Sequence, residues 1–280
     1  MITLRCIVDN TVLRGSEFWG EHGVAFWIET TAGNLLFDTG QSGAVLAHNA
    51  ELMQVGIKRC DALAISHAHF DHTGGLERFF SLSRSGIPLY ANPDIFRERY
   101  SLKEGKMRAI GMHLSQAEVE RQARLYLSAD PMEILPGVWT TGEIRERLAF
   151  EGRSAQHHIQ IGETWQPDPY QDDLSLVLKT SQGLVVVCGC CHAGLLNTLA
   201  HIRRFFSQPI QAVVGGTHLE AAGSEALNQV IAELRGHNGE CVPNLYLNHC
   251  TGERALIALA QAFGEKVNPC PAGMVLRFNE

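Results

Sequence analysis

The sequence predicts a four-layer αββα sandwich, an α/β fold in which two β-sheets pack face to face and helices cover their outer sides. Two observations predict it. Each half of the chain begins with short, β-branched apolar runs typical of buried strands, and each then continues into amphipathic helical segments. In addition, 280 residues are enough for one large core or two modest ones, and no repeat of fixed period is present. We expect a single domain over residues 1–280.

The first half of the chain is expected to supply one sheet and its helix. Three apolar runs are typical of buried strands: residues 4–10, 23–40 and 60–67. The sequence ETTAGN within the second run indicates a hairpin turn. Two further segments complete this half: a Gly-rich turn with an amphipathic helix at residues 73–82, and a strand with a turn at residues 87–94.

Residues 95–130 are charged and helical in character, so we predict a helical insertion, or lid, between the two halves. It carries five basic residues: Arg97, Arg99, Lys103, Lys106 and Arg108. These side chains either close over a substrate and contact its phosphates or form a solvated helical face. The solvated face is the favoured interpretation, because scattered charges on a helix usually face water.

The second half repeats the order of strands followed by helices. Strands are predicted in the apolar runs at residues 133–144, 172–180, 183–194, 210–220 and 244–252. Helices are predicted at residues 195–206, 225–236 and 253–263. The second sheet and its covering helices therefore come from this half.

The composition excludes several classes of function. The formal net charge is −7 and the sequence has no run of Lys or Arg, so it lacks the concentrated positive charge typical of proteins that bind nucleic acids. No apolar stretch is long enough to span a bilayer, and MITLRCIVDN alternates like a strand and does not resemble a signal sequence. The eight cysteines are not arranged as a disulfide framework and indicate reduced thiols. We expect a cytoplasmic protein with a small-molecule substrate and neither nucleic-acid nor membrane partners.

The sequence SHAHFDHTGGL, residues 66–76, concentrates metal-binding groups. In extended backbone, alternate side chains point to the same side, so His67 and His69 share a face, Asp71 continues the spacing and His72 lies beside it. Imidazoles and carboxylates suit zinc, iron or manganese, and four such groups exceed the need of a single site. Two metals held by one loop is therefore the economical interpretation, and a His-rich polar turn without function is the alternative.

This motif resembles the metallo-beta-lactamase superfamily of dinuclear metal hydrolases, whose signature is His-x-His-x-Asp-His after a buried strand. The stretch ALAISHAHFDHTGGL matches it in residues and context, and the similarity extends to LLFDTG upstream and to later strand ends. It implies the αββα metallo-beta-lactamase fold with one or two divalent metal ions, zinc first and manganese, iron or magnesium as alternatives. Asp38 in LLFDTG either supports the His loop or caps a turn.

Three later strands end in a histidine, at His192, His218 and His249. One such histidine alone is usually a satisfied core side chain, but three beside this motif favour ligation. We expect His192 to join His67 and His69 at one metal, and His249 to join Asp71 and His72 at the other. His218 is either a further ligand or a residue that contacts the substrate.

The chain departs from the common pattern of the superfamily, in which Gly-Asp ends the middle strand and the aspartate bridges two metals. Here the strand reads Gly189-Cys190-Cys191-His192. Either the bridge is absent, or Cys190 supplies a thiolate, or His192 reaches one metal. His157 and His158 are weaker candidates for a ligand, and we expect them in an exposed loop.

These departures resemble a branch of the superfamily that includes the dihydropterin-transferring synthase of methanopterin biosynthesis and bacterial metal-dependent hydrolases. The first hypothesis is hydrolysis of a small cytosolic phosphorylated or ester-like substrate by a metal-activated water. Asp71 would orient that water or accept its proton, with His218 as a second catalytic residue. The alternative is a synthase that displaces pyrophosphate, and a non-catalytic or redox metal protein comes third. Trp139, Trp165 and Tyr170 either line the substrate pocket or pack against neighbouring side chains. The other residues that bind the substrate are not predicted. A homodimer is compatible with the sequence.

Overall fold

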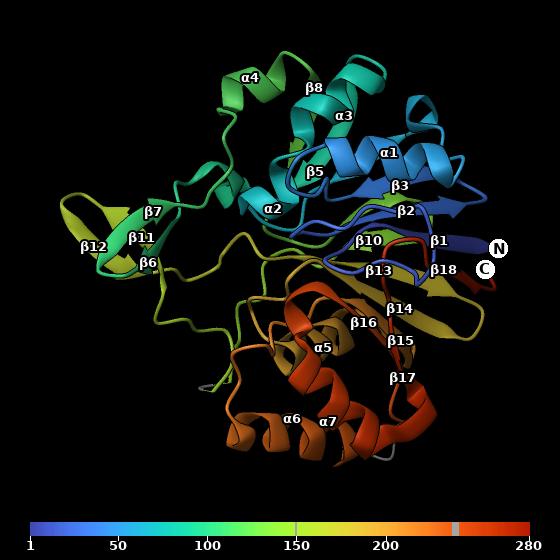
Figure 1. The fold of residues 1–280 in the computed structure, drawn as a ribbon, viewed down its shortest axis with the longest axis vertical. Helices are drawn as coiled ribbons and strands as arrows, with labels where there is room; N and C mark the ends of the chain where they lie inside the picture. The colour runs from blue at the N-terminus through green and yellow to red at the C-terminus, as the bar shows by residue number, and fades with distance from the viewer. Residues whose placement is uncertain (149, 237–240) are drawn as a thin grey trace.

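The computed structural model describes residues 1–148, 150–236 and 241–280 and confirms the αββα sandwich (Figure 1). In spatial order, the first sheet consists of β18 (Val275–Phe278), β1 (Ile2–Val8), β2 (Ala25–Thr30), β3 (Gly33–Phe37), β4 (Ala62–Ala64), β5 (Ile87–Ala91) and β8 (Ala123–Leu127). The second consists of β17 (Val267–Pro269), β16 (Asn244–Leu247), β15 (Ile210–Gly215), β14 (Gly183–Cys188), β13 (Ser175–Thr180), β10 (Val138–Thr140) and β9 (Met132–Leu135).

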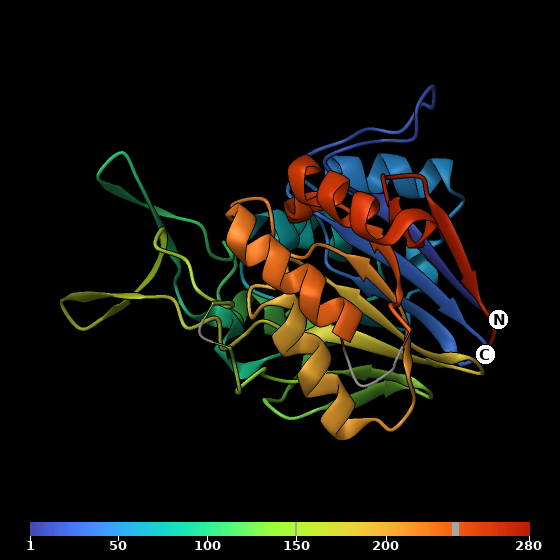
Figure 2. The same cartoon turned by 90° about the horizontal axis from the view of Figure 1, so that it is seen from below.

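Helices cover the outer faces of both sheets. The first sheet is covered by α1 (Ala44–Leu52) and α3 (Leu76–Leu82), with the short α2 (Phe70–Thr73) at its edge. The second is covered by α5 (Leu195–Phe205), α6 (Ser224–Gly236) and α7 (Glu253–Phe263) (Figure 2). Short 3-10 turns are η1 (Ile57–Arg59), η2 (Pro93–Phe96), η3 (His249–Thr251) and η4 (Gly264–Lys266). Among the described helices, none combines the length and apolarity needed to cross a membrane.

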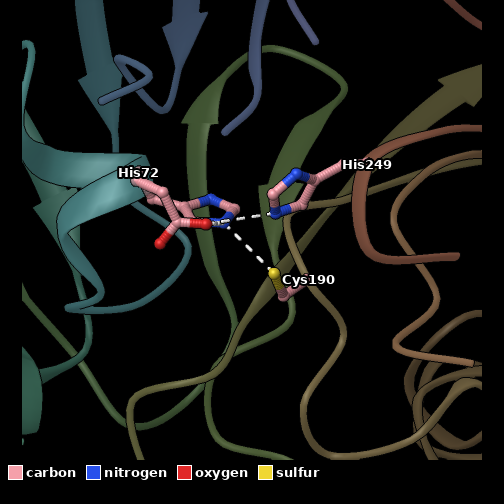
Figure 3. A group of neighbouring side chains, drawn as sticks. His72, Cys190 and His249 are labelled. Carbon is pink, nitrogen blue, oxygen red and sulfur yellow. Dashed lines mark hydrogen bonds and ion pairs between the residues drawn. The ribbon is translucent and has the colours of Figure 1, made fainter. Parts of the chain in front are cut away.

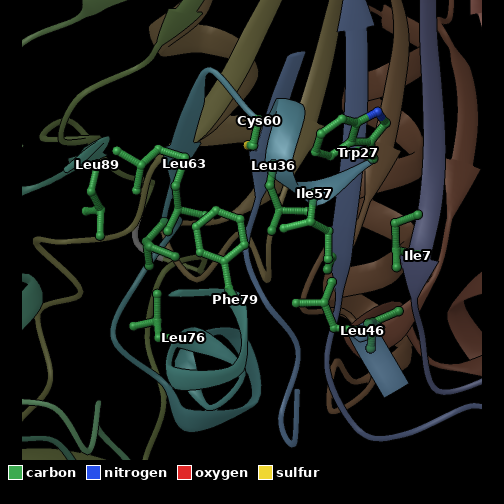
Figure 4. Packing of buried hydrophobic residues seen from close by; sticks show 14 of the residues in the cluster. Ile7, Trp27, Leu36, Leu46, Ile57, Cys60, Leu63, Leu76, Phe79 and Leu89 are labelled. Atoms are coloured by element: carbon green, nitrogen blue, oxygen red, sulfur yellow. The ribbon is translucent and has the colours of Figure 1, made fainter. Parts of the chain in front are cut away.

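Three apolar clusters hold the layers together: one under α1 and α3, one between the sheets, and one under α5, α6 and α7. In the first cluster, Phe79 of α3 points toward Leu63 of β4 (Figure 4). In the second sheet, β14, β15 and β16 run parallel, and every residue of β14 is buried. Because both faces of such a strand are covered, it forms a continuous apolar run, which is how the sequence pattern identified it.

The predicted helical insertion is wrong in its secondary structure. Residues 95–130 contain the hairpin of β6 (Tyr100–Lys103) and β7 (Lys106–Ala109), the short α4 (Gln116–Glu120) and then β8. The turn between β6 and β7 places Glu104 and Gly105 in the left-handed region, at φ 53° and 73°. A pairing partner distant in sequence then stabilises the hairpin, and such tertiary pairing overrides local helix propensity.

That partner is β11 (His157–Ile161), which pairs with β6 and with β12 (Thr164–Pro167). The order β12-β11-β6-β7 makes a four-stranded sheet, which we call the accessory sheet. It projects from the sandwich on the side away from the chain termini, as both ribbon views show. The expectation that His157 and His158 lie in an exposed loop is therefore wrong, because both are in a strand.

Candidate metal centre

The His-rich loop lies where buried strand β4 leads into α2. His67 and His69 lie in the loop, and Asp71 and His72 belong to α2. All four side chains are buried. The loop lies at the edge of the first sheet, next to the second sheet. Its side chains therefore face the ends of β14, β15 and β16.

Those three strands are parallel, so their carboxyl ends share one edge of the sheet. His192 follows β14, His218 follows β15 and His249 follows β16. The structure thus brings the three histidines selected from separate strand ends to the same place as the His-rich loop.

The donor atoms form two groups. The first, which we call the imidazole group, contains His67, His69 and His192. Nε2 of His192 lies 3.2 Å from Nε2 of His67 and 3.0 Å from Nδ1 of His69. Burial, together with the neighbouring imidazoles, lowers the pKa of His67 and His192 well below the usual value. Three neutral imidazoles whose nitrogens converge in this way suit a divalent cation such as zinc.

The second, mixed group contains Asp71, His72, Cys190 and His249. Oδ2 of Asp71 lies 3.2 Å from Nε2 of His249 and 3.6 Å from Nε2 of His72. Nε2 of His72 lies 3.2 Å from Sγ of Cys190 (Figure 3). Nε2 of His249 is buried without a hydrogen-bond partner. Nitrogen, oxygen and sulfur donors that converge on one point, with one nitrogen unsatisfied, fit a metal ion.

The charges of the mixed group depend on one another. Burial acts to lower the pKa of His72, but the carboxylates of Asp71 and Asp38 outweigh it and raise the pKa to about 9. Burial opposes ionisation of Asp71, yet His72 and His249 hold its pKa well below the usual range. Burial raises the pKa of the Cys190 thiol. Without metal, His72 and Cys190 therefore both carry protons that a bound metal would displace.

Asp38 supports the loop from behind. Its Oδ2 lies 2.7 Å from Nδ1 of His72, and its two oxygens accept hydrogen bonds of 2.7 Å from the backbone and hydroxyl of Ser66. The Ser66 hydroxyl in turn lies 2.8 Å from Nδ1 of His67. Gly189 is required beside them, because a Cβ there would lie 2.2 Å from Oγ of Ser66. One carboxylate thus orients ligands in both donor groups.

A buried arginine supports the imidazole group from the other side. Arg99 of the insertion is only 1% exposed and forms ion pairs of 2.7 Å with Asp172 and 3.1 Å with Asp168. Asp172 accepts a 2.7 Å hydrogen bond from the backbone N–H of Ala68, between His67 and His69. Its neighbour Asp173 accepts one of 2.8 Å from Ala193, directly after His192. Consecutive aspartates therefore fix both backbone segments that carry the imidazole group.

A family model described as "Metallo-beta-lactamase superfamily" matches residues 19–158, half of the chain. The chain is also 31% identical to the "7,8-dihydropterin-6-methyl-4-(beta-D-ribofuranosyl)-aminobenzene-5'-phosphate synthase" of Methanocaldococcus jannaschii, across 99% of this chain and 97% of that protein. The chain belongs to the metallo-beta-lactamase superfamily.

Solved structures agree with this assignment. The structure of Tm1679, described as a metal-dependent hydrolase of the beta-lactamase superfamily, is 26% identical with a TM-score of 0.83, and each chain covers the other completely. Zn(2+)-bound PqqB from Methylobacterium extorquens is 10% identical with a TM-score of 0.56, and covers 99% of this chain and 100% of its own. At that identity the second likeness shows the fold alone. Membership of this superfamily implies that the chain binds divalent metal.

In this superfamily member, Cys190 occupies the place where the common pattern has an aspartate, and its sulfur faces the mixed group. His218 belongs to neither donor group, but its ring lies 4.3 Å from that of His192. Burial acts to lower the pKa of His218, whereas its hydrogen bond with Cys250 raises it, and the net shift is upward. His218 therefore lies beside the imidazole group and is not one of its three donors.

Several residues of the site carry unusual backbone conformations. Asp38, Cys191, His218 and His249 all have positive φ, between 48° and 60°. Such strain outside glycine persists only where the surroundings enforce it, and it clusters at functional sites. Four instances around one centre show that the surrounding structure enforces these conformations at the candidate site.

The sequence did not reveal the roles of Asp9 and Asn10. Asp9 accepts a 2.8 Å hydrogen bond from the backbone N–H of His249, and Oδ1 of Asn10 lies 2.8 Å from Nδ1 of the same residue. They follow β1, whose end reaches the site from the first sheet. The only signal was a pair of polar residues directly after a buried strand.

Some of the aromatic and basic residues identified in the sequence pack away from the donor groups, and others lie close to them. Trp139 packs on Phe206, and Trp165 packs edge-on against Tyr100. Tyr170 reaches the site, where its ring stacks on His192 at 4.6 Å. Among the bases, the solvated-face interpretation is wrong for the buried Arg99. It holds for Arg108, which is exposed and lies 3.7 Å from Glu104.

Proposed function

We propose that the chain is a metal-dependent hydrolase of a small phosphorylated or ester-like molecule, with one metal at the imidazole group and a second at the mixed group. One observation carries the proposal. Residues of both donor groups line one cavity of about 930 Å³: His69 and His192 of the imidazole group, and Asp71, Cys190 and His249 of the mixed group. A cavity of this size accommodates a complete small-molecule substrate above the metal centre.

The bound metals would polarise the scissile group and lower the pKa of a water molecule. Asp71 shares its carboxylate with His72 and His249, which suits orienting that water. His218 lines the cavity beside His192, where it can give a proton to the departing oxygen. The oxygen of the water would form the new bond and keep one of its protons, its other proton would pass to Asp71, and the leaving group would depart with its bonding electrons and the proton given by His218.

Two cations at the rim of the cavity favour a phosphorylated substrate. Lys103 and Arg153 line it, and neither has an ion-pair partner among the described residues. Glu220 lines the same cavity and would repel an anion. Arginine and lysine are the usual partners of phosphate, so these two side chains are suited to bind a phosphate away from the metals.

A dihydropterin-transferring synthase reaction is the second candidate, because the 31% identity to the Methanocaldococcus synthase extends over the whole chain. In this version an aromatic acceptor takes the place of water, and pyrophosphate departs from the donor. The size of the cavity also favours it, because two reactants must be held at once.

The deciding experiment is product analysis by mass spectrometry. Zinc-loaded protein is given dihydropterin pyrophosphate with and without the ribofuranosyl-aminobenzene phosphate acceptor. Hydrolysis predicts phosphate or pyrophosphate release that ignores the acceptor, whereas the synthase predicts a joined product only when the acceptor is present.

Two variants serve as controls. His67→Ala should abolish either product, because it removes an imidazole-group donor. His113→Ala, an exposed histidine of the insertion, should leave both reactions unchanged. If products persist in His67→Ala, they do not arise at the metal centre and the proposal is wrong.

A further inference from the structure

His157 reaches the metal centre from the accessory sheet. It lies in β11, opposite Ser101 of β6, and lines the cavity. Its ring centroid is 5.0 Å from that of His69 and 5.6 Å from that of His192. It belongs to neither donor group. The sheet that projects from the sandwich therefore places one more imidazole beside the three histidines of the imidazole group.

Tyr170 fixes the orientation of this ring. Its hydroxyl lies 2.9 Å from Nδ1 of His157. The phenol side chain cannot easily move, because Tyr170 is 1% exposed and its ring stacks on His192 at an angle of 7°. Its backbone is held as well, since its N–H donates to Asp168 and its carbonyl accepts a hydrogen bond from Arg147.

The contact with Tyr170 determines which nitrogen of His157 is left for a ligand. Nδ1 faces the phenol, so Nε2, on the opposite side of the ring, remains for the cavity. The neutral imidazole has a lone pair on one nitrogen, and we assign it to Nδ1, so that the Tyr170 hydroxyl donates to Nδ1. The proton of the neutral ring is then on Nε2, and His157 presents an N–H donor to the cavity.

We propose that His157 is a catalytic residue, whose Nε2–H donates a hydrogen bond to an oxyanion of the substrate bound at the imidazole group, and that Tyr170 is the positioning residue for it. This inference rests on the proposed metal-dependent activity. A fixed donor aimed at developing negative charge lowers a barrier because it needs no reorganisation during the reaction. Phosphate and pyrophosphate oxygens are anions of the required kind.

The same geometry gives the accessory sheet a function. The sheet carries His157 at its inner end and Lys103 farther along its paired strand β6, and both line the cavity. Two residues along a strand correspond to roughly 7 Å, so a substrate that contacts His157 can extend along this sheet toward the rim. The accessory sheet is thus a wall of the substrate site, and His157 is its contact nearest to the metals.

The test uses the zinc-loaded full chain and measures the dissociation constant of inorganic pyrophosphate by isothermal titration calorimetry, with zinc content determined on the same samples. His157→Ala should weaken binding about 10-fold or more, since it removes one hydrogen bond to a charged group. His157→Gln should recover part of the loss, because its amide can donate from nearly the position of Nε2. Zinc content should not change in either variant.

His158→Ala is the matched control. His158 is the next residue of β11, its side chain points to the other face of the strand, and its Nδ1 lies 3.0 Å from the carbonyl of Gln156. Pyrophosphate binding by this variant should stay within about twofold of the original protein, which is the usual size of a surface effect. Tyr170→Phe should retain its zinc. Its binding of pyrophosphate should be weaker than that of the original protein, but the loss should be smaller than in His157→Ala. The ¹⁵N signal of the His157 ring should change in this variant.

Each other result has a definite meaning. Equal pyrophosphate binding by the original protein and by His157→Ala, or no binding by either, overturns the inference. A loss of zinc in His157→Ala also overturns it, because the residue is then a metal ligand. If pyrophosphate binding depends on His157 but neither pterin reaction occurs, the inference stands and dihydropterin pyrophosphate is excluded as the substrate.

Discussion

The two donor groups lie side by side where the His-rich loop meets the second sheet, but they differ in charge and in what supports them. The imidazole group consists of neutral histidines whose pKa values are lowered by burial. The mixed group combines a carboxylate and a thiol with His72, whose pKa is raised to about 9. The first group is therefore ready for a metal at neutral pH, whereas the second must release protons. The two halves of the centre should therefore fill differently with metal, and in metal-free protein they should contribute to folding stability with opposite pH dependence.

The largest effect is expected from removing one donor of each group. His67→Ala should lose the metal of the imidazole group and His249→Ala that of the mixed group, so metal analysis should show about one ion fewer in each. Because each metal contributes several kcal/mol to the transition state, activity should fall about 1000-fold in both variants. Equal metal content in all three proteins would show that the two groups are not separate sites.

The pH dependence of stability should separate the groups by sign. In metal-free protein, the raised pKa of His72 contributes stability that is present below its unfolded value near 6.5 and is lost as pH rises through about 9, a difference of about 3 kcal/mol. The lowered pKa of His67 has the opposite effect. Below about pH 6.5 this histidine is protonated in the unfolded chain but stays neutral in the folded chain, so stability is lost as pH falls through that value.

Urea unfolding at about pH 5.5, 7 and 9.5 measures this difference. His72→Gln should reduce the alkaline loss, and His67→Gln should reduce the acid loss, of which His69 and His192 retain a part. The same slope for both variants would contradict the assignment of charge to the two groups.

The supports of the two groups should also be separable. Asp38→Asn weakens the contact with His72, and Asp172→Asn weakens the contact with Ala68 between His67 and His69. Loss of such a supporting contact typically costs about 10- to 100-fold in metal affinity. Competition with a zinc chelator should therefore show weaker binding at both groups for Asp38→Asn, with the larger loss at the mixed group that it contacts directly, and weaker binding at the imidazole group alone for Asp172→Asn. Asp61→Asn, an exposed aspartate paired with Arg84, is the matched control.

The smallest effect should come from exchanging the unusual ligand. Cys190→Asp gives the mixed group the carboxylate of the common pattern. Because thiolate prefers zinc and carboxylate suits manganese, the ratio of zinc to manganese affinity should fall about 10-fold, with little change at the imidazole group. An unchanged ratio would indicate that Cys190 does not contact the metal.

The sequence allowed the fold and the two donor groups to be predicted for a clear physical reason. Strands buried on both faces, such as β14, form continuous apolar runs, and the ends of parallel strands meet at one edge. The residues directly after such runs, among them His192 and His249, are therefore found without knowing the structure. Cys190 was one of several alternatives, and the structure places its sulfur among the mixed donors.

The accessory sheet and its residues could not be predicted in the same way. The hairpin of β6 and β7 depends on β11, more than fifty positions away, and nothing local in residues 95–130 encodes that pairing. His157 and Arg99 acquire their positions only through it. The same holds for Asp9 and Asn10, because the sequence does not show that the end of β1 faces the end of β16.

The ion pairs of Arg99 have a consequence for how this protein can be recombined with its relatives. Arg99, directly before β6, is the only cation among the described residues that pairs with Asp168 and Asp172, so removing it would leave two buried carboxylates without a counter-ion. A chimera that exchanges residues 95–130 must therefore keep an arginine at this position beside its two aspartates. Exchange of the segment is thus constrained by buried charge as well as by strand pairing.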